Sequence, residues 1–460
     1  MISLQEDEMR KMLIIGMGIL FLCTGILSAT IINIPNDYPT IQQGINASQD
    51  SDTVLVADGT YTGYNNKNLT WDGNEKHIVV KSENGAENCI IDCEENGRGF
   101  DFTNTNQNVN DIISGFSIKN GLAENGGAIK CVNSSLKINS CIFIDNTSVG
   151  TWNFAAGGAI YFELSCINIH SCKFISNMSS NWYTTLGGAI YSYNSSGIVS
   201  NSLFAENSAF GVEFGARGGG LYSGYSNLEL LNNTFVFNWV NSMFGGEGGA
   251  VYCFNSNLQT TNSIYWGNTG GFGIPNQINY DGGQLVAEYN DIEFGGFPGI
   301  GNIDEDPLFA DTNNGDYHLT ENSPCIDVGN PDTTGLHLPP FDLDGNPRIY
   351  NGIVDMGCYE WQGVAVDDTI HTYHTVTLHQ NFPNPLKAST KISFFLPHPD
   401  NIKIRIYNLK GQLVETLLNE NKPAGIHTLE WNAENICSGI YFMKLFTKEK
   451  VFIRKLVVIK

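Results

Sequence analysis

The chain has 460 residues, of which 15% are charged and 50 are glycine, and its formal net charge is −23. This length can hold two or three ordinary domains, and few charges with many glycines are typical of a turn-rich, all-β protein. The acidic balance argues against nucleic acid and anionic membrane as partners and is compatible with a secreted or surface protein that binds cations.

Residues 1–29 have the layout of a secretory signal peptide. Arg10 and Lys11 precede an apolar run at residues 12–27, and Ser28-Ala29 supplies small residues for cleavage. The alternative is a single-pass membrane anchor, for which the run is slightly short. We therefore predict an exported protein with no transmembrane segment in the mature chain.

Residues 36–62 predict the beginning of a β-solenoid. Pro39 can start a short helix whose Ile41 and Ile45 lie on one side, and the β-type run DTVLVADGTY follows at residues 52–61. Such a helix would cover the open end of the stack, where strand edges and apolar core would otherwise be bare. This opening resembles that of the pectin-lyase-like right-handed β-helix family, and the resemblance implies that fold.

Between Gly126 and Asn268 the chain repeats itself five times, with steps that alternate between 31 and 30 residues. A Gly-Gly pair opens each copy, at Gly126, Gly157, Gly187, Gly218 and Gly248. An asparagine follows with the same steps, at Asn146, Asn177, Asn207, Asn238 and Asn268. Two anchors that keep one register indicate a stacked solenoid rather than five separate modules.

Each copy holds three short β-type runs joined by Gly, Asn and Ser, for example residues 159–163, 166–169 and 172–174. Strands that stack in parallel on their copies make a parallel β-helix with a rise of about 4.8 Å per turn. The Gly-Gly-Ala-Ile copies also resemble the polymorphic outer-membrane protein repeat of bacterial surfaces. We therefore predict an all-β protein, a right-handed parallel β-helix with repeats over about residues 99–270.

Three columns of apolar residues should fill the core of this β-helix. They are Ile129, Ile160, Ile190, Leu221 and Val251; Phe143, Phe174, Phe204, Phe235 and Tyr265; and Leu136, Ile167, Ile198, Leu228 and Leu258. The asparagine column should lie at a bend, where stacked amides hydrogen-bond to turn backbone that cannot otherwise pair. A binding role is the alternative for these amides.

Cysteines recur at one inward position of the repeat, as Cys141 and Cys172, and are interpreted as small buried residues. An exported protein could also oxidise them, pairing Cys141 with Cys172 and Cys89 with Cys93. The sequence has no Cys-x-x-Cys motif and no Cys/His cluster, so it indicates no zinc site.

Beyond the repeats, acidic and cysteine-containing motifs follow one another over about residues 300–362. They are DEDPLF at 304–309, DYHL at 316–319, SPCID at 323–327, DLDGNPR at 342–348 and DMGCYE at 355–360. Together they resemble the closing segment of bacterial surface β-helix proteins of the choice-of-anchor kind. The resemblance implies the end of the solenoid, and hence a β-helix domain at residues 30–364, but no particular chemistry.

After a polar linker at residues 365–375, the composition changes. The motifs LHQNFPNP at 378–385, SGIYF at 438–442 and KLVVIK at 455–460 resemble the type IX secretion sorting domain block by block. The resemblance covers residues 376–460. It implies a small seven-stranded β-sandwich, recognition by the type IX secretion machinery, export across an outer membrane and attachment to the surface.

Large aromatic residues gather on one side of the predicted solenoid. The candidate ligand-binding residues are Tyr161, Tyr191, Tyr193, Tyr222, Tyr252, Trp152, Trp182 and Trp239. The tyrosines should point outward from the first strand, and the tryptophans lie in loops that should stack into a wall along that face. Sugar rings stack on exposed aromatic strips of this kind. The alternative is that the loops fold over the tyrosines and the aromatics pack on one another.

Two loops rich in oxygen ligands are candidate calcium sites. Their residues are Asp342, Asp344 and Asn346, and Asp311, Asn313 and Asp316. Both loops place oxygen atoms around a glycine as calcium loops do. Neither has the distal glutamate of an EF-hand at its place, and Asx-rich turns look the same in sequence. Calcium is therefore one hypothesis, and a structural turn is the other.

Catalysis is the runner-up interpretation. Arg217, with Glu213 one loop away, offers the base and carboxylate that a polysaccharide lyase needs. Asp145 and Glu206 share a column two turns apart, roughly 9.6 Å by strand spacing, which borders the range of inverting glycosidases. A solvated pair explains these carboxylates as well, and neither family's catalytic motif is present.

These patterns favour a secreted, surface-displayed β-helix followed by a small β-sandwich. The favoured function is non-catalytic binding of polysaccharide or another surface, as in an adhesin. The alternative is a polysaccharide lyase or glycoside hydrolase, because the same fold hosts both kinds of protein.

Overall fold

The computed structural model describes residues 29–363 except 151–153, 214, 244, 295–296 and 351, and residues 376–459 except 379–380, 382–383, 385, 397–398, 424, 435 and 449. The chain forms two compact units, Met1–Val364 and Ala365–Lys460. The predicted linker and all but the last residue of the predicted signal peptide lie outside the described residues. No helix in the described part of the chain combines the length and the apolar character of a membrane span.

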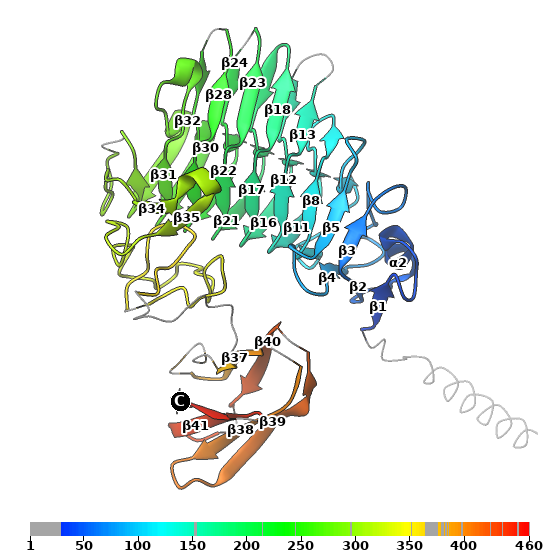
Figure 1. The fold of residues 1–460 in the computed structure, drawn as a ribbon, viewed down its shortest axis with the longest axis vertical. Helices are drawn as coiled ribbons and strands as arrows, with labels where there is room; N and C mark the ends of the chain where they lie inside the picture. Colours follow the sequence, from blue (N-terminus) through cyan, green and yellow to red (C-terminus); the bar gives the residue numbers. More distant parts are fainter. Residues whose placement is uncertain are drawn as a thin grey trace, which may run out of the picture. The chain divides into compact units, whose positions relative to one another are not determined.

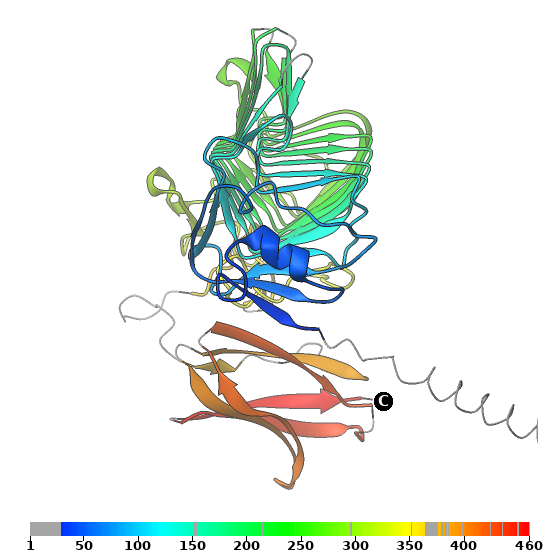
Figure 2. The ribbon, with the colours of Figure 1, turned by 90° about the vertical axis from the view of Figure 1, so that its right-hand side faces the viewer.

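The first unit is a parallel β-solenoid, in which each turn lays its strands on those of the turn before (Figures 1 and 2). Its largest sheet consists of two stacks of strands, here called the first limb and the second limb, which are joined by one long strand. The first limb contains β6 (Phe100–Thr103), β10 (Ile129–Val132), β15 (Ile160–Glu163), β20 (Ile190–Tyr193) and β25 (Leu221–Gly224). The second limb contains β1 (Ile31–Ile34), β2 (Thr53–Val56), β4 (Val79–Ser82), β7 (Ile112–Ser114), β11 (Leu136–Asn139), β16 (Cys166–His170), β21 (Ser196–Ser200) and β26 (Asn227–Leu231). The long strand β30 (Val251–Thr261) pairs with both limbs, and β32 (Ile278–Glu288) pairs with β30.

A nine-stranded sheet completes the solenoid. It is here called the third sheet, because the two limbs of the largest sheet are counted as the first and the second. It contains β3 (Gly59–Tyr61), β5 (Cys89–Asp92), β8 (Ser117–Lys119), β12 (Ile142–Ile144), β17 (Lys173–Ile175), β22 (Leu203–Ala205), β27 (Thr234–Val236), β31 (Ile264–Trp266) and β33 (Asp291–Ile292). A 3-10 turn, η1 (Gly271–Gly273), follows β31.

Two more sheets form a wall beside the solenoid. One contains β9 (Leu122–Ala123), β13 (Thr147–Val149), β18 (Met178–Asn181), β23 (Ser208–Gly211) and β28 (Trp239–Asn241). The other contains β14 (Phe154–Ala156), β19 (Thr184–Leu186), β24 (Gly215–Arg217) and β29 (Gly246–Glu247). Ala209, Ala216 and Val240 pack between the two sheets. The prediction of three strands per turn is therefore incomplete, because the loops are long enough to pair with their own copies.

A short helix lies beside the first strand of the solenoid, as the sequence predicts (Figure 1). It is α2 (Ile41–Ala47), which buries Ile41 and Ile45 against the core. Gly44 allows the close approach, since a Cβ atom there would lie 2.6 Å from Cδ1 of Ile34.

The core follows the predicted columns with one exception. The phenylalanine rings of the third sheet stack directly, with centroids 4.6 Å apart between Phe174 and Phe204 and 4.3 Å apart between Phe204 and Phe235. The exception is Ile198, which pairs with Asn168 rather than with Ile167. Ile198 therefore lies on the outer face of the second limb, and its assignment to the core column is wrong. A one-residue offset in a strand moves a side chain to the other face.

The asparagine column is a buried hydrogen-bonded ladder at the bend between the third sheet and the wall. Nδ2 of Asn207 donates to Oδ1 of Asn238 at 2.9 Å and to the carbonyl of Phe174 at 2.9 Å. The backbone N–H of Asn207 donates to the same Oδ1 at 3.0 Å. All five asparagines are fully buried, which confirms the structural interpretation. A second ladder, made by Ser134, Ser165, Ser195, Ser226 and Ser256 between the two limbs, was not predicted.

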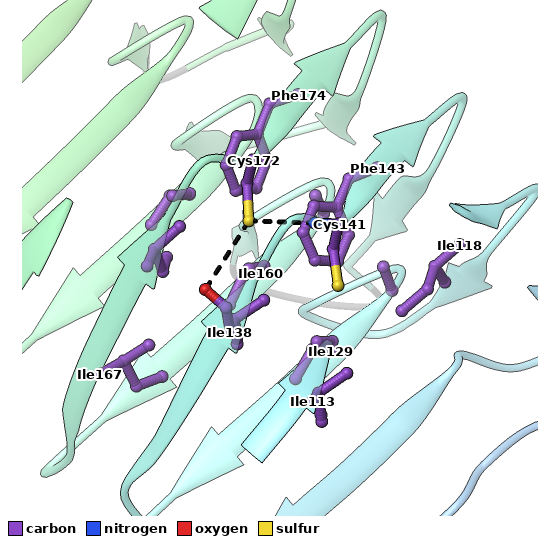
Figure 3. Close-up of a cluster of buried hydrophobic side chains, with 14 of the residues drawn as sticks. Ile113, Ile118, Ile129, Ile138, Cys141, Phe143, Ile160, Ile167, Cys172 and Phe174 are labelled. Atoms are coloured by element: carbon purple, nitrogen blue, oxygen red, sulfur yellow. Dashed lines mark hydrogen bonds between the residues drawn. The ribbon is translucent and has the colours of Figure 1, made fainter. Parts of the chain in front are cut away.

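The described cysteines are free thiols, and most are buried. Figure 3 shows that Cys141 and Cys172 lie at equivalent places of adjacent turns, where the N–H of Cys141 donates to Sγ of Cys172 at 3.4 Å. Ser202 continues this column, and its Oγ accepts the N–H of Cys172 at 3.1 Å. The cysteines therefore occupy a bend position whose small side chains bond to the neighbouring turn.

The closing segment contains β34 (Phe309–Asp311), η2 (Thr312–Asn314) and β35 (Asp316–Leu319). It covers the outer side of the third sheet, which the resemblance did not imply. Tyr317 and Tyr359 pack with Leu203 and Val236 in one buried cluster. Leu203, Ala205 and Val236, which point outward from β22 and β27, can be apolar because this segment shields them from water.

The second unit consists of a three-stranded and a four-stranded antiparallel sheet. The first sheet contains β36 (Thr377–Leu378), β37 (Ser389–Leu396) and β40 (Gly425–Asn432). The second contains β38 (Asp400–Asn408), β39 (Leu413–Lys422), β41 (Gly439–Phe446) and β42 (Val451–Val458). Both sheets contribute to one buried cluster that includes Phe394, Ile404 and Trp431.

Candidate functional site

The tyrosine column points outward from the first limb, but the wall covers it. Tyr161, Tyr191, Tyr222 and Tyr252 are only 6%, 5%, 7% and 3% exposed. Phe154, Ala156 and Leu186 of the wall belong to the same apolar cluster. The loops thus fold over the tyrosines, and these four rings present almost no surface to a ligand. Burial raises the pKa of Tyr222 to about 12.

The other candidate aromatics lie in different surroundings. Trp182 and Trp239, on the wall, are 62% and 38% exposed. Nε1 of Trp182 donates to Oε1 of Glu213 at 3.3 Å. Tyr193 is half-buried at the end of β20, and Trp152 lies outside the described residues.

An aromatic ridge with one exposed member, Tyr225, lies at the bend between the two limbs. We define it by Tyr193, Tyr225 and Phe254, whose rings meet edge to face at 5.6 Å and 5.3 Å around Tyr225. Tyr225 is 48% exposed and holds a left-handed backbone conformation, with φ of 51°. This conformation points the ring away from the solenoid at the position that the neighbouring turns fill with Asn194 and Asn255.

Next to the ridge, an open groove of about 500 Å³ follows the outer face of the second limb. Its polar lining consists of Asn168, Asn227, Glu229, Asn257, Gln259 and Gln284. In-register pairing places Asn227 beside Asn257, whose Nδ2 donates to Oδ1 of Asn227 at 2.8 Å. Amides that repeat from turn to turn give the groove both hydrogen-bond donors and acceptors.

Sequence reasoning missed this outer groove. Asn227 and Asn257 differ by 30 residues, which is the repeat step, so the signal was present in the second strand of each copy. The groove was missed because Ile198 was assigned to the core. Ile198 is in register with Asn168 and Glu229, which point outward and line the groove.

The catalytic candidates do not converge in the described part of the chain. Nε of Arg217 lies 3.6 Å from Oε2 of Glu247, and its guanidinium covers the ring of Tyr252 at 5.2 Å. Glu213 contacts Trp182 instead of Arg217. Asp145 and Glu206 are exposed residues with left-handed backbones at equivalent bends two turns apart.

The carboxylates of the two candidate calcium loops are occupied by protein groups. Oδ1 of Asp342 accepts backbone N–H groups from Asp344 at 3.0 Å and from Asn346 at 2.7 Å, which is a turn of the Asx type. Nδ2 of Asn314 donates to Oδ2 of Asp311 at 2.6 Å. No group of three His, Cys, Asp or Glu suited to a metal occurs among the described residues. Calcium binding, including any role of Asn313, stays a prediction.

The imidazole of His318 joins the two loops. Its Nδ1 lies 2.5 Å from a carboxylate oxygen of Asp316, and its Nε2 lies 2.5 Å from a carboxylate oxygen of Asp344. Hydrogen bonds to Asp344 and Asp316 outweigh partial burial and raise the pKa of His318 to about 9. At neutral pH an imidazolium therefore supplies the positive charge between these carboxylates.

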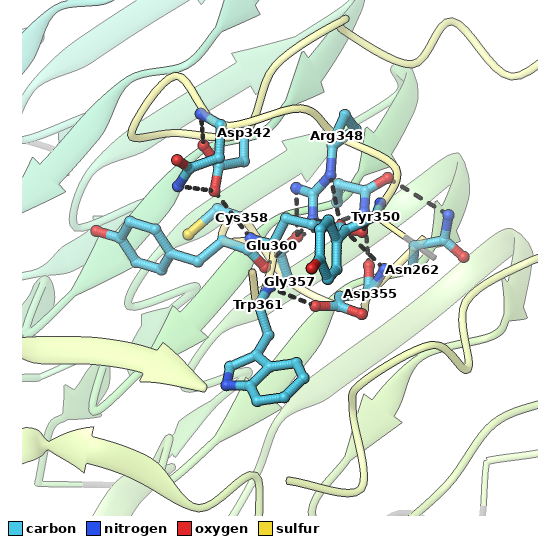
Figure 4. Close-up of polar contacts among 12 residues, drawn as sticks. Asn262, Asp342, Arg348, Tyr350, Asp355, Gly357, Cys358, Glu360 and Trp361 are labelled. Carbon is cyan, nitrogen blue, oxygen red and sulfur yellow. Dashed lines mark hydrogen bonds and ion pairs between the residues drawn. The ribbon is translucent and has the colours of Figure 1, made fainter. Parts of the chain in front are cut away.

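A buried ion pair anchors the rest of the closing segment (Figure 4). Nη2 of Arg348 lies 2.6 Å from Oε2 of Glu360, and both side chains are almost fully buried. Nη1 of Arg348 donates to Oδ1 of Asn201 on the solenoid at 3.0 Å. Burial raises the pKa of the nearby Asp355 to about 6. This network fixes the segment to the solenoid.

Residues 380–460 match a family model described as secretion system C-terminal sorting domain. Among curated proteins, none matches the chain. The match spans nearly all of the second unit, and the solenoid lies outside it. The chain is therefore a β-solenoid protein with a C-terminal type IX secretion sorting domain, and it is secreted to the cell surface or the extracellular space.

Proposed function

We propose that this protein is a non-catalytic binding protein that holds an extended polysaccharide in the outer groove, with sugar rings stacked on the aromatic ridge. The observation that carries the proposal is the continuity of the two surfaces, since Tyr225 precedes the groove residue Asn227 by two positions. Sugars need apolar ring faces to stack on and amides or hydroxyls to bond to, and these surfaces supply both.

The shape of the groove favours a chain over a small molecule. Its amides recur on stacked strands about 4.8 Å apart, so a ligand with its own repeat can make the same contacts on successive turns. Each contact is weak alone, and repetition raises the overall affinity.

The charge of the groove favours a neutral polysaccharide. Glu229 is the one ionisable carboxylate in its lining, and the unit that holds it is strongly acidic. A polyanionic chain would meet repulsion along this face, whereas a neutral chain meets mainly amides and an aromatic ring.

The test compares binding of the purified full chain and its variants to insoluble glucans, xylans and mannans and to soluble uronans. Tyr225→Ala and Asn227→Ala should each weaken retention by about tenfold, which corresponds to about 1.4 kcal/mol. Trp182→Ala is the matched control, because this ring is also exposed but lies on the wall. Thermal unfolding of each variant verifies that the solenoid stays folded.

Two results would contradict the proposal. One is equal retention of wild type and Tyr225→Ala on the polysaccharide that wild type binds best. The other is release of reducing ends or unsaturated products from any member of the panel, which would support the enzymatic alternative.

A further inference from the structure

The charge of this chain is unevenly divided between its two units. Residues 376–460 hold twelve Lys or Arg against six Asp or Glu, which gives a formal charge of +6. Since the whole chain has a net charge of −23, the first 375 residues have a net charge of −29. The acidic balance that argues against anionic partners therefore applies to the solenoid and not to the sorting domain.

Part of this positive charge faces outward from the four-stranded sheet. Alternation along β38 buries Ile404 and Ile406 in the domain core, so Lys403 and Arg405 point to the opposite face. Antiparallel pairing places Phe446 of β41 opposite Lys403. These residues line a pocket of about 320 Å³ together with Asn401, Thr447 and Lys448.

The cations of this pocket are poorly neutralised. Within the described part of the domain, Lys403 and Arg405 form no ion pair, and Nζ of Lys448 lies 3.6 Å from Oδ1 of Asp400. Among the described residues, the three cationic side chains thus have one carboxylate partner, Asp400, which leaves a local excess of positive charge for a ligand to balance.

One nitrogen atom of Arg405, Nε, is buried without a hydrogen-bond partner among the described residues. A buried N–H without an acceptor costs free energy, and no described protein group offsets that cost here. The guanidinium presents parallel N–H groups whose geometry fits phosphate oxygens, and a phosphate brings both the charge and the acceptors that the pocket needs.

We propose that this pocket of the sorting domain binds a phosphate oxyanion through Arg405, Lys403 and Lys448. Val451 and Ile453, on the next strand of the same sheet, are 49% and 48% exposed and lie opposite Phe446 and Lys444. Exposed aliphatic side chains beside a phosphate pocket favour a phospholipid headgroup as the source of the phosphate, because the acyl region can cover them.

The experiment titrates the full chain with inorganic phosphate by calorimetry and sediments it with vesicles of phosphatidylcholine, with and without phosphatidylglycerol. Arg405→Gln should weaken phosphate binding by about tenfold or more. Lys410→Gln removes an equal charge from an exposed position outside the pocket and should leave binding within about twofold. Sedimentation that needs phosphatidylglycerol and is lost in Arg405→Gln assigns the phosphate to a lipid; phosphate binding without sedimentation assigns it to a soluble or glycan-borne group.

Three results would overturn the pocket. They are absence of binding to both probes, equal binding by wild type and Arg405→Gln, and equal weakening by Lys410→Gln and Arg405→Gln, which would show a diffuse charge effect. Lys403→Gln provides a second pocket variant if Arg405→Gln unfolds the domain. Thermal unfolding verifies that the sorting domain of the Lys403→Gln variant is folded before its binding is measured.

Discussion

Tyr161 and Tyr191 lie on adjacent turns of the first limb with ring centroids 4.8 Å apart and ring planes 13° from parallel. Pairing of β15 with β20 sets this spacing, because the two tyrosines are partners in the ladder. The wall covers both rings, so the column forms a second apolar layer outside the first limb. A regular row of aromatic residues in a solenoid can therefore be a packing element rather than a binding surface.

Replacement of a tyrosine in this layer should cost stability. Tyr191→Ala should lower the free energy of unfolding by about 3 kcal/mol or more, as truncation of large buried aromatics does. Tyr225→Ala removes the same atoms from an exposed position and should cost less than about 1 kcal/mol. Urea unfolding of both variants measures the difference, and equal losses would show that the wall does not shield Tyr191.

Much of the solenoid could be predicted from the sequence, because period and register are encoded by residues that recur. Gly126 and Asn146 with their copies were enough to define the turn and the asparagine ladder. The position of the wall over Tyr191 could not be predicted, since alternation says only that a side chain points outward and not what covers it. The groove depended on the register of Ile198, where one residue decides between core and surface.

The asparagine ladder should be among the most sensitive parts of the solenoid. Asn207→Ala leaves the carbonyl of Phe174 and the amides of the neighbouring turns without partners in a buried place. Unpaired buried groups cost about 1–3 kcal/mol each, so we expect a loss of several kcal/mol in unfolding free energy. Asn168→Ala, on the half-exposed outer face, should change stability little. A loss below about 1 kcal/mol for Asn207→Ala would contradict the ladder.

Stability of the closing segment should depend on pH through His318. Its folded pKa is about 9, above the ordinary 6.5, so protonation favours the folded state. The stabilisation is fully present below pH 6.5 and is lost as pH rises through about 9. The difference in unfolding free energy between wild type and His318→Gln should therefore be largest in mild acid and shrink in alkali. A difference that grows with pH would show that His318 is neutral in the folded protein.

Removal of residues 376–460 should separate folding from delivery. The solenoid has its own core, so the shortened chain should keep its β circular-dichroism spectrum and its melting transition. The sorting domain carries the secretion match, so the same chain expressed in a type IX-competent bacterium should stay inside the cell envelope. Surface labelling of intact cells measures this, and full display of the shortened chain would contradict the role of the domain.

The central claim is that polysaccharide lies in the outer groove and on its aromatic ridge. Hydroxyl-radical footprinting of the full chain tests it most directly, because exposed aromatic side chains oxidise in proportion to their accessibility. With the polysaccharide that the protein retains, oxidation of Tyr225 should fall at saturation while that of Trp182 stays unchanged. Protection of Trp182 and Trp239 with Tyr225 unaffected would place the ligand on the wall and contradict the account.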